Sequence, residues 1–131
     1  MIGQRFYIDK YDWQVMVLYE VGSDSADIVI GMLESICKDN KILDSAYESL
    51  SNGKPNTGFT YSDYDKRRSF MVIGKTTSVR ETINTIVHEA NHLKSHIATE
   101  FDIDEKGEEV CYLIGSIVGN MYSVFRKFIC S

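Results

Sequence analysis

Three residues in the middle of the chain have the types and spacing of a metal site with an adjacent proton acceptor. His88 and His92 are four residues apart, and Glu89 directly follows the first of them. On an α-helix this spacing puts both imidazoles on one face, where each can reach the same metal ion at a Zn–N distance of about 2.0–2.1 Å. Glu89 is rotated by about 100° from His88, so its carboxylate lies beside the open position of the metal without ligating it. The spacing predicts a divalent metal site, zinc or another ion. A chance arrangement on a solvated helix face is the alternative.

His96 extends this row of histidines, but we do not expect it to be the third ligand. A rise of 1.5 Å per residue separates His88 from His96 by about 12 Å along a straight helix. The longer histidine motif of the metzincins is also missing, because Lys94 and Ala98 stand where that motif has Gly and His. We therefore expect His96 to be exposed, or to contact a ligand residue rather than the metal.

A carboxylate from the next helix is the expected third ligand, as in zinc sites built from two His and one Glu. Glu108 is favoured because the small residues on its helix face would let the two helices approach closely. This face carries Cys111, Tyr112, Gly115 and Gly119. Glu109 is the second choice, since its face also carries Leu113 and Ile117, which we expect in the core. The alternative role of Glu108 is to stabilise the helix N-terminus through the helix dipole. The other carboxylates nearby are Asp102, Asp104 and Glu105.

The motif needs a helix and a surface that supports it, and the flanking sequence predicts both. Ser78-Val79-Arg80-Glu81 forms a capping box, so the motif helix should begin at Ser78. Apolar residues then recur at steps of three and four: Ile83, Ile86, Val87, Ala90, Leu93, Ile97 and Phe101. The supporting sheet is predicted from a strand or strand pair in residues 6–21 and a β-hairpin with strands at 59–61 and 69–73. In the first of these segments, one face should carry Trp13, Val15, Val17 and Tyr19.

Three further helices are expected around this unit. They cover residues 23–40, residues 44–52, and a final segment from Glu108 to about Phe128. The final helix is apolar nearly all round and should therefore be largely enclosed. About four helices, with a small mixed or antiparallel sheet packed against the motif helix, give an α+β fold in a single domain over residues 1–131.

Charge and composition restrict the partners. The net charge is -5 and the isoelectric point is about 5.1, which argues against nucleic-acid binding. The one basic cluster, Lys66-Arg67-Arg68, should be a solvated hairpin tip. The three cysteines have no short metal-ligand spacing and should be buried free thiols in a reducing compartment: Cys37, Cys111 and Cys130. The chain shows no signal peptide and no run long enough to span a membrane, so we expect a cytoplasmic protein without a membrane partner. The pattern gives no indication of oligomeric state.

The motif His88-Glu89-Ala90-Asn91-His92, followed by Glu108-Glu109-Val110-Cys111-Tyr112, resembles gluzincin-type metallopeptidases. It is also similar to short zincin-like proteins encoded by phages and mobile elements of bacteria, and the resemblance covers residues 59–121. It implies a zincin-like fold, Zn²⁺ as cofactor, and His88, His92 and Glu108 as ligands, with Glu89 as the general base. The chain departs from larger gluzincins in having Tyr112 instead of Asp four residues after the ligand Glu. Tyr112 is then a candidate to orient a ligand or stabilise an oxyanion, with simple packing as the alternative.

The resulting expectation is a zinc-dependent hydrolase, most simply a peptidase in which Glu89 activates a zinc-bound water, acting on a peptide or protein substrate. Residues 69–73 would form the sheet edge beside the cleft and align the substrate by strand addition. The alternatives are a catalytically silent zincin-fold interaction protein and a hydrolase of a non-peptide amide or ester. Glu89 favours an enzyme, because a structural zinc site is closed by four protein ligands and needs no base.

Overall fold

The centre of the molecule is a four-stranded mixed sheet, which confirms the α+β class. The computed structural model describes residues 1–129. In space the strands follow the order β1-β2-β4-β3. β1 (Ile2–Ile8) pairs antiparallel with β2 (Trp13–Val21), β2 pairs parallel with β4 (Arg68–Gly74), and β4 pairs antiparallel with β3 (Gly58–Asp63).

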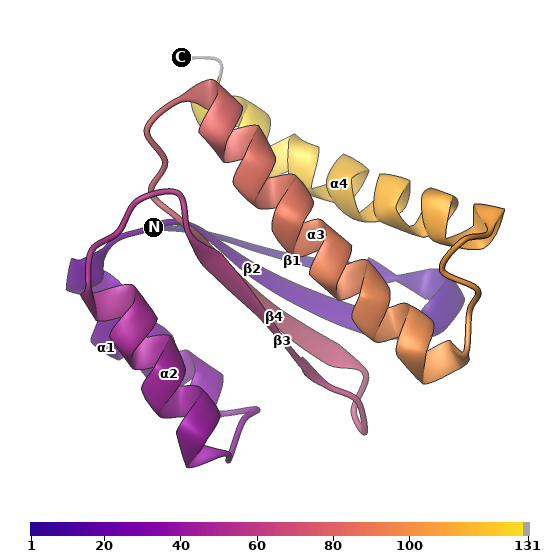
Figure 1. Ribbon diagram of the computed structural model, residues 1–131, viewed down its shortest axis with the longest axis horizontal. Helices are drawn as coiled ribbons and strands as arrows, with labels where there is room; N and C mark the ends of the chain where they lie inside the picture. The colour runs from indigo at the N-terminus through magenta and orange to yellow at the C-terminus, as the bar shows by residue number, and fades with distance from the viewer. Residues whose placement is uncertain (130–131) are drawn as a thin grey trace.

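Helices cover both faces of this sheet (Figure 1). Parallel pairing of β2 with β4 requires a crossover, and the chain makes it through α1 (Ala26–Glu34), α2 (Asn40–Ser51) and then β3. α1 and α2 lie on one face, and α3 (Val79–Phe101) and α4 (Glu108–Ile129) lie on the other. Single turns of 3-10 helix, Asp9–Tyr11 and Ser23–Ser25, connect the first elements.

Alternation along β2 divides the core into two parts. Trp13, Val15, Val17 and Tyr19 are buried together against α3 and α4, which confirms the expected shared face. Leu18 faces the other way and packs with α1 and α2, and Val21 joins it because the strand is irregular between Leu18 and Val21, where Glu20 has a positive φ. Each face of the sheet therefore has its own apolar layer, and the motif helix lies on the first.

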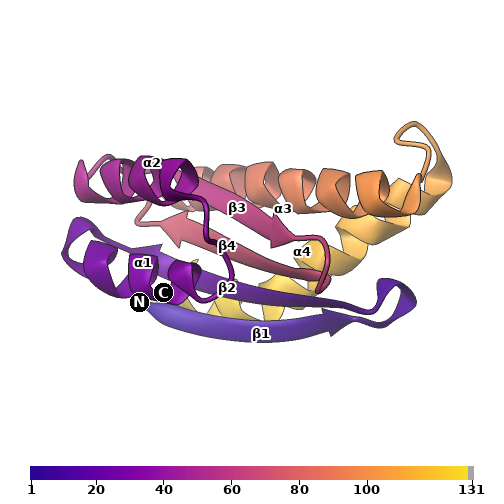
Figure 2. The ribbon, with the colours of Figure 1, turned by 90° about the horizontal axis from the view of Figure 1, so that it is seen from below.

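The two C-terminal helices cover different strands of that face. Figure 2 shows α3 on the β3 side of the sheet and α4 on the β1 side. The contacts agree, since α3 touches β3 and β4 whereas α4 touches β1 and α3. The amide of Gln4 on β1 also donates to the carbonyl oxygen of Asn120 on α4, at 2.8 Å.

Several element boundaries differ from those expected. The first helix ends at Glu34 rather than near Asn40, and α2 begins at Asn40 because the Asp39 side chain accepts from the backbone N–H of Lys41. The expectation that residues 69–73 form the sheet edge is wrong, because β4 lies between β2 and β3. β3 is the edge strand on this side.

The expectation that the last helix is largely enclosed is also wrong. α4 buries one stripe, consisting of Val110, Leu113, Ile117, Met121 and Phe125. Its opposite face is open, and Tyr112 is 77% exposed there. Cys111 is an exposed free thiol rather than a buried one, whereas Cys37 is buried as expected and Cys130 lies outside the described residues.

The basic cluster lies where it was expected, at the turn between β3 and β4. It is not simply solvated, because the guanidinium of Arg67 lies 4.8 Å from the centre of the Phe101 ring and Arg68 pairs with Asp63 at 3.1 Å. Within residues 1–129, no helix combines the length and the apolar character needed to cross a membrane.

Candidate metal site

A well-defined helix carries the candidate site. α3 begins as expected, since the Ser78 hydroxyl accepts from the backbone N–H of Glu81 at 3.1 Å. It continues for 23 residues without Gly or Pro and ends where Asp102 adopts a left-handed conformation. An unbroken helix fixes the relative positions of residues four apart, so the motif is held rigidly.

His88 and His92 converge at the surface of α3. Their Nε2 atoms are 3.2 Å apart, and the two rings meet nearly at right angles with centroids 4.8 Å apart. A tetrahedral ion with Zn–N bonds of about 2.0–2.1 Å holds two nitrogens about 3.3–3.4 Å apart. The His88 side chain is 66% exposed, so the pair is open to an ion from solvent. The two histidines therefore fit as ligands of one metal ion.

Glu89 lies beside this pair but points into the protein. It is 3% exposed, and its Oε1 accepts a hydrogen bond from the Thr60 hydroxyl on β3 at 2.8 Å. Its other oxygen, Oε2, lies 4.0 Å from His88 Nε2. The pKa of this carboxyl is raised overall, because burial outweighs the hydrogen bond from Thr60 and the charges of His92 and His88, which lower it. The carboxylate is thus fixed at one oxygen and turned toward the histidines at the other.

The edge strand approaches α3 closely because its inward-facing residues are small. A Cβ atom on Gly58 would lie 2.4 Å from the carbonyl oxygen of Val72 and 3.2 Å from Cγ of Glu89. Gly58, Thr60 and Ser62 occupy alternate positions of β3 and so face the same side of the sheet. None of the three was identified from the sequence. The alternation of small and polar residues in Gly-Phe-Thr-Tyr-Ser is the signal that could have found them.

His96 does not join His88 and His92. It ends a chain of hydrogen bonds that runs across the sheet from β2 through β4 and β3. The indole N–H of Trp13 donates to Ser69 Oγ at 2.8 Å, and Ser69 and Ser62 are joined at 2.6 Å. Ser62 Oγ lies 2.6 Å from His96 Nδ1. The indole N–H can only donate, so Ser69 accepts from Trp13. Ser69 can then donate its hydroxyl proton to Ser62, and Ser62 can donate its own to Nδ1 of His96, so that both hydroxyl protons are used. Burial, and secondly the charge of His92, lowers the pKa of His96, in keeping with a neutral ring.

The residues expected from α4 do not reach the histidines. Glu89 and His96 contact β3, whereas α4 packs on the opposite flank of α3, over β1. In residues 1–129, no three His, Cys, Asp or Glu side chains gather as a metal-binding group, so Glu108 does not join the pair. The Tyr11 hydroxyl donates to Glu109, which also pairs with Lys10 at 3.4 Å.

The small-residue face of α4 does not turn toward α3 either, because the large apolar residues of α4 take the buried side. Nothing lies within 4 Å of a Cβ atom built on Gly115 or Gly119. Tyr112 is on this exposed face, away from the candidate site. The structure therefore brings together His88, Glu89 and His92 and leaves Glu108 and Tyr112 apart from them.

A groove follows the outer side of the edge strand. It has a volume of about 540 Å³ and lies between α2 and β3, with Thr60, Tyr64 and His96 among the residues that line it. It therefore follows the strand that holds Glu89 and reaches His96 on α3, whereas His88, Glu89 and His92 are not part of its lining.

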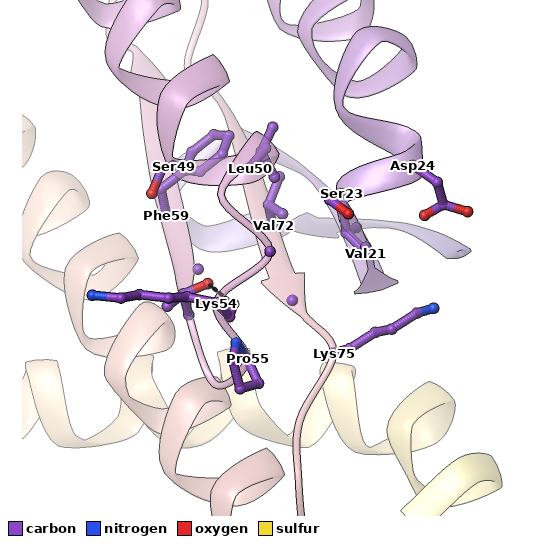
Figure 3. A pocket seen from close by; sticks show the side chains of 15 residues that line it. Val21, Ser23, Asp24, Ser49, Leu50, Lys54, Pro55, Phe59, Val72 and Lys75 are labelled. Carbon is purple, nitrogen blue, oxygen red and sulfur yellow. Dashed lines mark hydrogen bonds between the residues drawn. The ribbon is translucent and has the colours of Figure 1, made fainter.

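A second cavity, of about 350 Å³, lies where β3 begins and α2 ends (Figure 3). Lys54 and Lys75 are its cationic residues, and the figure shows their side chains extending in opposite directions. His88, Glu89 and His92 are not part of its lining. This cavity is separate from the candidate metal site.

Comparison with protein-family models, curated proteins and solved structures finds no match for this chain. The resemblance to zincins therefore rests on the sequence motif.

Proposed function

We propose that this protein binds a divalent metal ion, most simply zinc, through His88 and His92, and that it hydrolyses a peptide or a related amide with Glu89 as the base. The observation that supports this best is the convergence of the two Nε2 atoms, 3.2 Å apart, directly beside a buried carboxylate. Burying a carboxylate costs free energy unless it has hydrogen-bonding or charged partners. A helix that only packs against the sheet would be more stable with an apolar residue at the position of Glu89.

A bound zinc ion would supply Lewis acidity, which polarises a carbonyl group and makes water easier to deprotonate. The protein supplies the group that accepts the proton and holds it in position. Thr60 Oγ1 donates to Oε1 of Glu89 and keeps the carboxylate oriented, which leaves Oε2 as the atom that accepts a proton. Proton transfer by a side chain held in this way contributes about 10²–10⁴-fold to a rate.

The edge strand β3 is the best candidate for substrate binding. Its outer edge is unpaired in the sheet, and an extended peptide can add to such an edge through backbone hydrogen bonds. Thr60 on this strand already contacts the proposed base, and the groove between β3 and α2 offers space for side chains. This role moves from residues 69–73, where the sequence suggested it, to residues 58–63.

A metal-binding interaction protein without turnover is the second candidate, and one observation favours it. Within the described residues, no three His, Cys, Asp or Glu side chains are grouped so that they could hold a metal ion, whereas catalytic zinc sites have three protein ligands. Turnover would then require that solvent, substrate or another molecule complete the metal's coordination. A zincin-like relationship remains part of the proposal.

The test compares wild type with Glu89→Gln after both have been loaded with zinc and given unstructured protein substrates. The variant keeps the shape of the side chain but cannot accept a proton, so hydrolysis should fall by at least about 10²-fold while zinc content stays unchanged. A wild-type protein that binds zinc and cleaves no peptide in a diverse library would favour the interaction protein. Loss of zinc from the variant would make Glu89 a ligand instead of a base.

A further inference from the structure

The outer face of α4 is unlike the outer face of an ordinary surface helix. No charged residue occurs between Glu109 and Arg126, although the helix buries only one stripe. α2 shows the usual pattern, since it exposes Lys41, Asp44 and Glu48. A helix that is apolar nearly all round is normally enclosed on all sides, and this chain encloses α4 on one side only.

The centre of that face consists of two tyrosines and two glycines. At 100° per residue, Tyr112, Gly115, Gly119 and Tyr122 point away from the buried stripe. The tyrosines are 77% and 52% exposed, and the space around both glycines is open. Exposed aromatic rings next to a flat strip are typical of a surface that another helix covers.

The arrangement of this face is symmetric about Ile117. The two glycines are each two residues from it and the two tyrosines five residues, while Glu108 and Arg126 are each nine residues away. Two copies of α4 packed antiparallel about this point would place Tyr112 of each copy level with Tyr122 of the other, and Gly115 level with Gly119, so that glycine faces glycine where the helices approach most closely. They would also bring Glu108 of each copy to Arg126 of the other, at both ends. A parallel pair would instead set like charges together.

We propose that the outer face of α4 is the interface of a homodimer. The two α4 helices pack antiparallel about a twofold axis that crosses this outer face at the level of Ile117, between Gly115 and Gly119. A twofold interface uses the same surface on both subunits, and the order acidic, aromatic, glycine, glycine, aromatic, basic is complementary to itself. The face lies on the flank of α3 away from β3 and the metal pair, so the dimer does not depend on the proposed function.

The first experiment measures the mass of the full chain as a function of concentration by sedimentation equilibrium. Wild type should show a reversible monomer–dimer equilibrium. Replacing both central glycines, Gly115→Leu with Gly119→Leu, should weaken dimerisation by at least about tenfold, because side chains would hold the helices apart. Gly31→Leu is the matched control, since Gly31 is also a helical glycine with open space around it, on α1. It should leave dimerisation unchanged.

The second experiment tests the antiparallel order. Glu108→Arg and Arg126→Glu should each weaken the dimer, and the double variant should associate more tightly than either single variant. Thermal melting of each protein shows that the fold is retained. A wild type that stays monomeric at every concentration would overturn the proposal, as would a glycine double variant that dimerises as tightly as wild type or a charge reversal that is not rescued. Binding of a monomer to lipid vesicles would assign the face to a membrane and would also overturn it.

Discussion

The candidate site depends on which individual residues converge. His88 and His92 sit at the surface with their Nε2 atoms 3.2 Å apart, whereas Glu89 is buried and held by Thr60. The local part of this arrangement follows from the motif, because helix geometry alone places residues four apart on one face. The partner Thr60 lies 29 residues away along the chain, and only the pairing of β3 with the rest of the sheet brings it into contact.

Glu108 was the third ligand expected from the sequence, and its effect on zinc affinity can be tested directly. Glu108→Ala should leave zinc affinity unchanged, because the structure places Glu108 on α4, apart from the histidine pair. His88→Ala and His92→Ala should each reduce affinity strongly, since each removes one of two ligands. Competition with a fluorescent zinc chelator measures all three. If the loss in Glu108→Ala matches that in the histidine variants, Glu108 is a ligand, as the sequence first suggested.

Among the elements, the start of α3 was easier to predict than the order of the strands, although the start of α2, expected at residue 44, lies at Asn40. The start of α3 at Ser78 depends on residues next to each other in the sequence, and it was confirmed. The central place of β4 was not predicted. It depends on parallel pairing with β2, a contact between segments about 50 residues apart that no local pattern specifies. The same limit explains why the sequence did not identify β3 as the edge strand beside the motif.

The close packing of Gly58 on β3 against the backbone of β4, and against Glu89 on α3, predicts a specific intolerance at Gly58. Gly58→Ala should destabilise the protein by about 1–3 kcal/mol, the usual cost of overpacking, because the new Cβ would overlap the carbonyl oxygen of Val72. Gly31→Ala, in open space on α1, should instead stabilise it by about 0.5–1 kcal/mol. Urea unfolding measures both changes. Equal effects at the two positions would mean that β3 does not approach its neighbours as closely as described.

The contact between the turn after β1 and the start of α4 predicts a pH dependence. The hydrogen bond from Tyr11, together with Lys10, lowers the pKa of Glu109 below its ordinary value of 4.5. A carboxylate with a lowered folded pKa stabilises the folded state above its unfolded pKa, and this stabilisation is lost as the pH falls through the folded value. Tyr11→Phe should therefore melt at a lower temperature than wild type at pH 7. The difference should shrink as the pH falls below 4.5, in thermal melts followed by circular dichroism. A difference that stays constant down to acid pH would mean that the bond does not influence the carboxylate.

For the whole molecule, the positions of α3 and α4 decide which surfaces are available for function. α3 lies over the edge strand and presents His96 to the groove there, while α4 lies on the other flank and leaves an uncharged face open. The sequence predicted the apolar character of α4 correctly but not its exposure, since a single chain does not show whether a second copy covers a face. It also predicted that His88 and His92 share one face of α3, but it placed Glu108 beside them, because the position of Glu108 depends on how α4 docks on α3.

The central claim is that His88 and His92 bind one metal ion through their Nε2 atoms. Nitrogen-15 NMR of the imidazole rings during titration with zinc tests it most directly, because it reports each ring nitrogen of each histidine separately. We expect Nε2 of His88 and Nε2 of His92 to shift together and to saturate at one zinc per chain. His96, bound to Ser62 through Nδ1, should keep its tautomer. If zinc leaves the His88 and His92 signals unchanged, or shifts His96 in their place, the claim is wrong.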